Sequence, residues 1–208
     1  MQCSGTPSGE SDCGNCTLMR LPARLLDPSE GRFAFGGVDL AALPAHRFAR
    51  HPARTDNQMD FQDSTGSLNP RYTAHNTING PCQLRRELGL ATLFVPHDLN
   101  VVRLLTDRVA VMHLGKIVEM GPSAKVFEQP AHPCTQALVS AIPGCGPRVR
   151  LDGEISSPID PPPTVCRFAS RCPAVPDRCL REAPALHGPA ATVAACHLAR
   201  WPATAPAS

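Results

Sequence analysis

The sequence lacks any run of about 18 consecutive apolar residues, the length that spans a bilayer, and its N-terminus lacks the apolar core of a signal peptide. It also lacks a strong charge of either sign, because 20 Lys and Arg residues are balanced by 18 Asp and Glu residues, a formal net charge of +2. A nearly neutral chain does not present the basic surface that nucleic-acid binding needs. We therefore expect a cytosolic protein with no membrane span and no nucleic-acid partner.

The 208 residues include 23 prolines, which gather in the first 70 residues and after position 143. Because proline removes a backbone N–H donor and interrupts helices and strands, we expect regular structure to be densest in the middle. The length suits one good-sized domain, or a domain plus a small module. Residues 1–8 are small and polar, which predicts a disordered start, and residues 201–208 predict a tail.

Apolar patterning in the central region predicts helices alternating with strands. The run 90–95 is apolar and β-prone, which is typical of a buried strand. Residues 98–106 have apolar side chains at helical spacing, with Asp98 as the cap. Residues 108–120 predict a β-hairpin at the edge of a sheet, turning at Gly115.

Shorter elements are predicted on both sides of this region. Two short helices follow the hairpin, in "SAKVFEQP" with Ser123 as the N-cap and in "HPCTQALVSAIP". Near the N-terminus, "TLMRLPARLL" predicts a short helix interrupted at Pro22, and "GRFAFGGVDL" predicts two strands joined by a glycine turn. The order of elements indicates an α/β fold, in which ligands gather at the carboxyl ends of strands, where His97 lies.

The segment "GESDCGNCT" at residues 9–17 has the glycine spacing of a phosphate-binding loop, G-x-x-x-x-G-K-[ST]. Asn15 stands at the lysine position, and Cys16 stands at the Ser or Thr position. The change at Asn15 removes the cation that pairs with phosphates, and a thiol is a poorer magnesium ligand than a hydroxyl. Because residues 1–8 show no β-prone run, no strand is expected to deliver the loop.

Residues 94–143, "FVPHDLNVVRLLTDRVAVMHLGKIVEMGPSAKVFEQPAHPCTQALVSAIP", resemble the C-terminal part of the ATP-binding subunit of bacterial ABC importers for dipeptides and oligopeptides. That family pattern has a strand ending in S-H-D, a long helix, a hairpin with L-G and an H-P-Y-T-x-x-L helix. Here Pro96 replaces the Ser of the first motif, and Cys134 replaces the Tyr of the last. The resemblance extends back to residue 9, which identifies the segment 9–17 as the Walker A position.

The resemblance implies ATP and magnesium as cofactors, and a role in energising dipeptide or oligopeptide uptake. It implies a cytoplasmic location on the inner face of the cell membrane, with membrane-spanning subunits and a second ATP-binding subunit as partners. His97 corresponds to the catalytic H-loop histidine that contacts the γ-phosphate; alternatively, it is a polar residue at a strand end. The implied nucleotide-binding positions are Gly9, Gly14, Asn15, Cys16, Thr17 and Gln62, the last being the Q-loop glutamine or a solvated loop residue.

The chain departs from the family between "TAHNTING" and "CQLRRELGL", near residues 78–83. There the family has a helical subdomain, the L-S-G-G-Q signature, and the Walker B strand with its metal-binding Asp and catalytic Glu. These parts close the nucleotide dimer and activate water, so we expect no ATP hydrolysis. The expected fold class is therefore α/β, an incomplete P-loop ABC nucleotide-binding domain at 9–142, followed by a loop-rich Cys-containing extension at 143–200.

Four cysteines in the extension follow the spacing C-x5-C-x6-C-x16-C: Cys166, Cys172, Cys179 and Cys196. They resemble the C-terminal extension of the peptide-importer ATPases, which in some members holds a 4Fe-4S cluster. Four thiolates suit either such a cluster or zinc, and the alternative is four reduced thiols in a small core. The bulky residues available for that core are too few to build it, so the segment is expected to need a staple: Phe168, Leu180, Leu186 and Trp201.

Two further hypotheses remain open from the sequence. As alternatives to an ATP-binding subunit, the chain could be a non-enzymatic metal- or Fe–S-binding interaction module, or a non-functional gene remnant. The histidines without a spacing that suggests a site are expected on the surface: His46, His51, His75, His113, His132 and His187.

Overall fold

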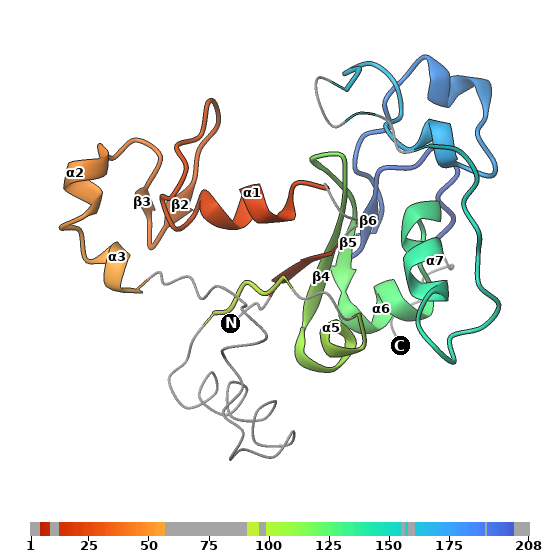
Figure 1. Ribbon diagram of the computed structural model, residues 1–208, viewed down its shortest axis with the longest axis horizontal. Helices are drawn as coiled ribbons and strands as arrows, with labels where there is room; N and C mark the ends of the chain where they lie inside the picture. The colour runs from red at the N-terminus through yellow and green to blue at the C-terminus, as the bar shows by residue number, and fades with distance from the viewer. Residues whose placement is uncertain are drawn as a thin grey trace. The chain divides into compact units, whose positions relative to one another are not determined.

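The computed structural model describes residues 5–8, 13–56, 91–95, 99–154, 157, 161–189 and 191–201. The chain divides into two compact units, one of Met1–Asn15 with Ala91–Ser208 and one of Cys16–Leu90. The first unit holds the main sheet and the larger apolar core, and the second holds a small hairpin with short helices (Figure 1). None of the helices in the described ranges is long and apolar enough to cross a bilayer.

A four-stranded mixed sheet with the order β1-β4-β5-β6 organises the first unit (Figure 1). The predicted antiparallel hairpin is confirmed as β4 (Arg108–His113) and β5 (Lys116–Pro122). β1 (Gly5–Ser8) runs parallel to β4, and β6 (Val193–Ala194) runs antiparallel to β5. The hairpin lies in the middle of the sheet, so the edge position predicted for it is wrong.

The hairpin turns at Leu114 and Gly115, whose φ angles are 44° and 73°. Two consecutive residues with positive φ match a two-residue type I′ turn, which continues the twist of the paired strands. Gly115 adopts this backbone freely because it has no Cβ, whereas Leu114 adopts it at a conformational cost. The glycine predicted at the turn is therefore the residue that the turn requires.

Two strand predictions are wrong. Residues 5–8 were expected in a disordered start with no strand before the loop, yet β1 pairs with β4 from Gly5 opposite Arg108 to Ser8 opposite Val111. A ladder is made by backbone groups, so β4 can pair with a segment of low β-propensity. Of the run 90–95 the structure describes residues 91–95, which have an isolated bridge at Leu93, 42% exposed, and no strand. Apolar β-prone residues do not form a strand without a continuous partner.

The three helices predicted in the central region are confirmed: α5 (Leu99–Leu105), α6 (Ser123–Glu128) and α7 (Pro133–Ser140). The cap predicted for α6 is wrong, because Pro122 is the N-cap and the Ser123 hydroxyl is buried. Strand β5 leads into α6 without a loop, and the Ser123 N–H donates to the Asp107 carbonyl at 2.9 Å. The backbone hydrogen bond from Ser123 to Asp107 therefore takes the place of the side-chain cap that was expected for α6.

The core of the first unit is rich in valine and contains two aromatic residues, Phe127 and Phe168. Val109, Val111 and Val118 from the hairpin pack with Phe168, which is 1% exposed. Phe168 belongs to the extension, beside the short 3-10 helices η1 (Ala169–Arg171) and η2 (Asp177–Leu180). The bulky residues of the extension, which the sequence indicated were too few for a core of their own, do not gather into one: Phe168 packs in the main core, while Leu180 and Leu186 are 58% and 46% exposed.

The second unit confirms the N-terminal predictions. Helix α1 (Asn15–Arg20), which begins at the boundary of the units, ends before Pro22, and β2 (Ala34–Phe35) pairs with β3 (Val38–Asp39) across two glycines of positive φ. Helices α2 (Ala45–Phe48) and α3 (Ala53–Asp56) complete the unit. Its core consists of Leu40, Phe48 and Ala53.

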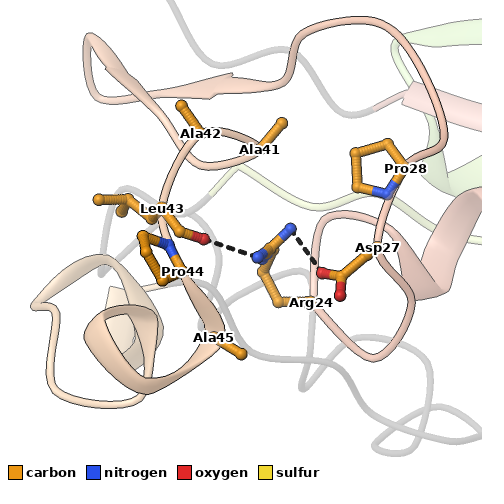
Figure 2. A pocket seen from close by; sticks show the side chains of 8 residues that line it. All are labelled: Arg24, Asp27, Pro28, Ala41, Ala42, Leu43, Pro44 and Ala45. Atoms are coloured by element: carbon orange, nitrogen blue, oxygen red, sulfur yellow. Dashed lines mark hydrogen bonds and ion pairs between the residues drawn. The ribbon is translucent and has the colours of Figure 1, made fainter.

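Figure 2 shows the pocket of about 290 Å³ in the second unit, with Arg24 at its centre. The Arg24 guanidinium donates to the Leu43 carbonyl at 2.7 Å and pairs with Asp27 at 2.8 Å. Its charge also lies 6.0 Å from the centre of the Phe48 ring. These contacts connect the segment after α1 to the start of α2, so Arg24 holds the unit together.

Replacing Phe168 with Ala is expected to lower the free energy of unfolding by about 3–5 kcal/mol, because it leaves a cavity in the shared core. Urea denaturation followed by circular dichroism measures this change. Leu180→Ala in the same extension is the control, and because Leu180 is largely exposed its effect should stay within about 0.5 kcal/mol. Equal losses in both variants would contradict the shared core.

Candidate functional site

Of the segment 9–17, which is predicted to be the Walker A position, the structure describes residues 13–17. The Gly115 N–H donates to the Cys13 carbonyl at 2.8 Å, so the end of the loop is fixed to the turn of the hairpin. Gly14 has a φ of 98°, and a Cβ placed on it would lie 3.5 Å from the Gly115 Cα. The glycine is therefore favoured by its backbone conformation, while the turn leaves room for a Cβ in ordinary van der Waals contact.

The side chains at the lysine and hydroxyl positions differ in their exposure. Asn15 is 9% exposed, and its Oδ1 has no hydrogen-bond partner within the described part of the chain. Cys16 and Thr17 are exposed. A buried neutral amide supplies no positive charge to a phosphate, so Asn15 does not fit the role of the lysine expected at this position. Gly9, Gln62 and His97 lie outside the described residues.

Arg167 of the extension contacts the same turn as the loop. Its guanidinium donates to the Leu114 carbonyl, and a Cβ on Gly115 would lie 3.6 Å from the Arg167 Nη1 atom. The turn therefore contacts both the end of the segment 9–17 and the Arg167 guanidinium of the extension. The hairpin turn joins the two sequence motifs.

A buried carboxylate fixes the start of α7. Glu119 on β5 is fully buried and accepts the backbone N–H groups of Ala131 and His132, both at 2.9 Å. Burial raises the pKa of the Glu119 carboxyl, and the hydrogen bond from Ala131 acts in the opposite direction. Glu119 therefore connects the sheet to the segment that begins α7.

Two histidines predicted on the surface are buried, so that prediction is wrong for them. His113 is 2% exposed and His132 is 1% exposed, and their rings lie 5.2 Å and 5.4 Å from the Phe168 ring, centre to centre. His132 Nδ1 accepts the Cys134 N–H at 3.0 Å and caps α7. His46 and His187 are exposed, as predicted, and His75 lies outside the described residues.

The environment of His132 keeps its ring neutral. Burial, together with the nearby His113, lowers the pKa of His132 to about 4, although a hydrogen bond to the Ala195 backbone acts in the opposite direction. The ring thus joins α7 to the segment that contains β6. The sequence signal for this role was the position of His132 directly before Pro133, because proline is favoured in the first turn of a helix and the residue before it is the cap.

The four cysteines of the extension interact with one another. The Cys166 N–H donates to the Cys179 carbonyl at 2.9 Å, and the two thiols also share a hydrogen bond. Burial, together with the other three thiols, raises the pKa of Cys179 to about 11, and burial also raises the pKa of Cys166 and Cys196. The fold therefore brings together the four residues that the spacing predicted.

The arrangement of these thiols is not that of a formed metal site. In the described ranges, no group of three or more His, Cys, Asp or Glu side chains is placed to hold a metal ion. The chemistry of the donor set, four thiols, nevertheless suits a cluster or zinc.

Residues 118–179 match the family model for the oligopeptide/dipeptide transporter C-terminal region. The chain is 33% identical over 282 residues to the Probable peptide ABC transporter ATP-binding protein y4tS of Sinorhizobium fredii, covering 95% of this chain and 79% of that protein. It is 30% identical over 277 residues to the oligopeptide transport ATP-binding protein AppF of Bacillus subtilis, covering 91% and 84%. The chain therefore belongs to the family of ATP-binding proteins of peptide ABC transporters.

A solved ATP-binding cassette, a dimer in a post-hydrolysis state bound to ADP and Pi, aligns with a TM-score of 0.46 and 12% identity. The alignment covers 58% of this chain and 85% of that chain. The family assignment comes from the sequence relatives.

The buried His132 predicts a pH dependence of stability. Because its pKa is lowered from 6.5 to about 4, its contribution is complete above pH 6.5 and is lost as the pH falls towards 4, about 3 kcal/mol in all. The raised pKa of Glu119 has the opposite effect, since stability falls as the pH rises from 4.5 towards the folded value. Urea denaturation at several pH values measures the sum of the two.

The variant His132→Asn separates these effects, because Asn keeps the capping position and cannot titrate, while Glu119 and His113 remain in both proteins. The difference between wild type and variant should therefore shrink between pH 6.5 and 4. The exposed His46→Asn is the control and should leave the pH profile unchanged. Parallel profiles for wild type and His132→Asn would contradict a depressed pKa of His132.

Proposed function

We propose that this chain is an ATP-binding subunit of a peptide ABC importer that has lost ATP hydrolysis. The observation that carries the proposal is Asn15, a buried neutral side chain at the lysine position of a Walker A loop whose end is still held by the sheet. The family role supports the first part of the proposal, since the relatives are named as ATP-binding proteins of peptide transport. The residues of this chain support the second part.

The catalytic elements expected between the Q-loop and the H-loop have no counterpart in the sequence. The alignment with the Sinorhizobium protein runs over 282 residues, more than the 208 of this chain, so that relative has residues with no equivalent here. The L-S-G-G-Q signature is absent from the sequence, as is a Walker B strand near 78–83. Without a carboxylate to orient water and hold magnesium, Gln62 and His97 do not suffice for phosphoryl transfer.

The loop itself does not fit MgATP. In such loops a lysine pairs with the β- and γ-phosphates, and a hydroxyl binds magnesium. Asn15 offers no charge, and the Cys16 thiol is a soft ligand that does not suit magnesium. We therefore derive no step of ATP hydrolysis from these residues. Of this segment the structure describes residues 13–17, where the Gly115 N–H donates to the Cys13 carbonyl.

The family role also sets the partners and the location that we propose. The partners are the membrane-spanning subunits of a peptide importer and a second ATP-binding subunit, which supplies hydrolysis. The location is cytoplasmic, at the inner face of the membrane. Residues 143–200 form the extension that follows the partial ABC domain at 9–142.

Restoring the two lost side chains tests the loop. The double variant Asn15→Lys, Cys16→Thr should bind MgATP about 10- to 100-fold more tightly than wild type, because hydrogen bonds to charged groups contribute about 1.5–3 kcal/mol. Isothermal titration calorimetry measures the affinity, and phosphate release measures hydrolysis. Hydrolysis should be absent from both proteins, since the missing elements lie elsewhere in the chain.

The matched control is Asn15→Gln, Cys16→Thr, which restores the hydroxyl without the charge and should gain much less affinity. Saturable ATP binding with phosphate release by the wild-type chain would refute the loss of activity. Equal affinities for the Lys and Gln variants would show that the loop no longer presents residue 15 to a phosphate.

A second candidate function is metal or cluster binding by Cys166, Cys172, Cys179 and Cys196. The proximity of these thiols favours it, since each of the other three interacts with Cys179. A 4Fe-4S cluster or zinc would join segments that have few buried apolar residues of their own, which is how small loop-rich regions are usually stabilised. This module would dock on a partner subunit without any enzymatic activity of its own.

Metal analysis and the visible spectrum of protein purified without oxygen test this candidate. Bound iron with brown colour, or one zinc per chain, is expected, and Cys166→Ser should lose it. Cys145→Ser changes a half-buried thiol outside the set and should retain the metal. Wild-type protein free of iron and zinc would exclude the candidate.

A further inference from the structure

One peptide group of the hairpin turn connects the extension to the end of the segment 9–17. The Arg167 guanidinium donates to the Leu114 carbonyl, and the Gly115 N–H donates to the Cys13 carbonyl at 2.8 Å. The Leu114 carbonyl and the Gly115 N–H belong to the same peptide bond, which is planar and resists rotation. The described part of the chain contains no cis peptide bond, and in a trans peptide these two groups point in opposite directions. The peptide group therefore lies between Arg167 and Cys13.

The charge of Arg167 strengthens the contact with Cys13. A cation that donates to a carbonyl oxygen polarises the peptide group, so that its N–H becomes a stronger donor. The guanidinium lies close to the turn, since a Cβ on Gly115 would be 3.6 Å from the Arg167 Nη1 atom. Arg167 is half-buried, which lessens the screening of its charge by water. Without this arginine, the Gly115 N–H would be an ordinary neutral donor.

The turn needs contacts of this kind because its own backbone is unfavourable. Leu114 has a φ of 44°, a conformation that a residue with a Cβ adopts at a cost. The segment that the turn holds lies beside it, since a Cβ on Gly14 would be 3.5 Å from the Gly115 Cα atom. The next residue is Asn15, at the expected lysine position. The peptide group of the turn thus sets where the end of the segment 9–17 lies.

We propose that Arg167 is a positioning residue for nucleotide binding. Through the peptide group between Leu114 and Gly115 it fixes the Cys13 carbonyl, and with it the backbone that precedes residue 15. Arg167 acts through the turn and does not itself contact the nucleotide. This inference rests on the proposed function, in which the segment 9–17 is the Walker A position. It gives the extension a role in nucleotide affinity that requires no metal or cluster.

The loop-restored chain, Asn15→Lys, Cys16→Thr, provides the affinity with which this role is tested. Adding Arg167→Met keeps much of the side-chain length but removes the donor and the charge. It should weaken MgATP binding about 10-fold, because a hydrogen bond from a charged group is lost. Adding Arg167→Lys keeps a charged donor and should retain most of the affinity. Isothermal titration calorimetry measures both.

The matched control is Arg178→Met in the same loop-restored chain. Arg178 also belongs to the extension, but it is exposed and pairs with Glu182 at 2.9 Å. Its loss should leave the affinity for MgATP unchanged, and circular dichroism checks that every variant is folded. A loss of affinity in Arg167→Met that Arg167→Lys restores distinguishes positioning from general damage to the extension.

The reactivity of Cys13 is a second measurement that needs no nucleotide. Cys13 is 5% exposed, so iodoacetamide reaches it only when this part of the chain opens. In the loop-restored chain, cleavage after Glu10 and at the introduced lysine leaves Cys13 as the only cysteine of peptide 11–15. Mass spectrometry should find alkylation of this peptide about 10-fold faster with Arg167→Met, since the same contact is lost. Arg167→Lys and Arg178→Met should leave the rate unchanged.

The two measurements separate this inference from the proposed function. MgATP binding that is equally tight with and without Arg167→Met would overturn the role of Arg167, whatever the alkylation rate. A loop-restored chain that binds no MgATP would refute the function proposed for the segment 9–17. In that case an unchanged alkylation rate of Cys13 would overturn the positioning by Arg167 as well, and a faster rate would support it.

Discussion

The burial of Phe168 against the central hairpin is the interaction on which the larger unit depends. The residue is 1% exposed, and it packs with valines of β4 and β5 while the rings of His113 and His132 meet it edge-on. The extension has few other buried apolar residues, so it cannot build a core alone. Because Phe168 packs in the main core, the extension is part of the same folding unit as the sheet. Burial of this one aromatic side chain thus joins the extension to the sheet, as a larger interface would join two domains.

Polar groups around this contact determine its geometry. Glu119 holds the backbone of Ala131 and His132, and the His132 ring continues the connection to Ala195. Glu119 and the His132 ring thus find hydrogen-bond partners, which is the condition for burying polar groups. The turn at Leu114 and Gly115 then meets both Arg167 and the end of the Walker A position. The loop and the extension are thus tied to one hairpin, although their chemical roles differ.

Much of this arrangement could be predicted from the sequence where the signal was local. Gly115 indicated the turn, and the apolar spacing in 98–106 indicated a helix, because both depend on neighbouring residues alone. The cysteine spacing indicated which four thiols belong together. The prediction failed for β1, where Gly5–Ser8 has little β-propensity and is a strand because β4 offers a backbone partner. It failed in the opposite sense for 90–95, whose apolar residues form only an isolated bridge.

The sequence by itself determined the family, and the proposal that Asn15 stands at the lysine position also comes from it, since both depend on residue identity and order. Only the tertiary structure decided that His113 and His132 are buried, that Phe168 joins the main core, and that Cys166 lies against Cys179. These features arise from contacts between residues far apart in the chain. Neither periodicity nor spacing records such contacts, because burial and pairing depend on what the rest of the chain places beside each residue.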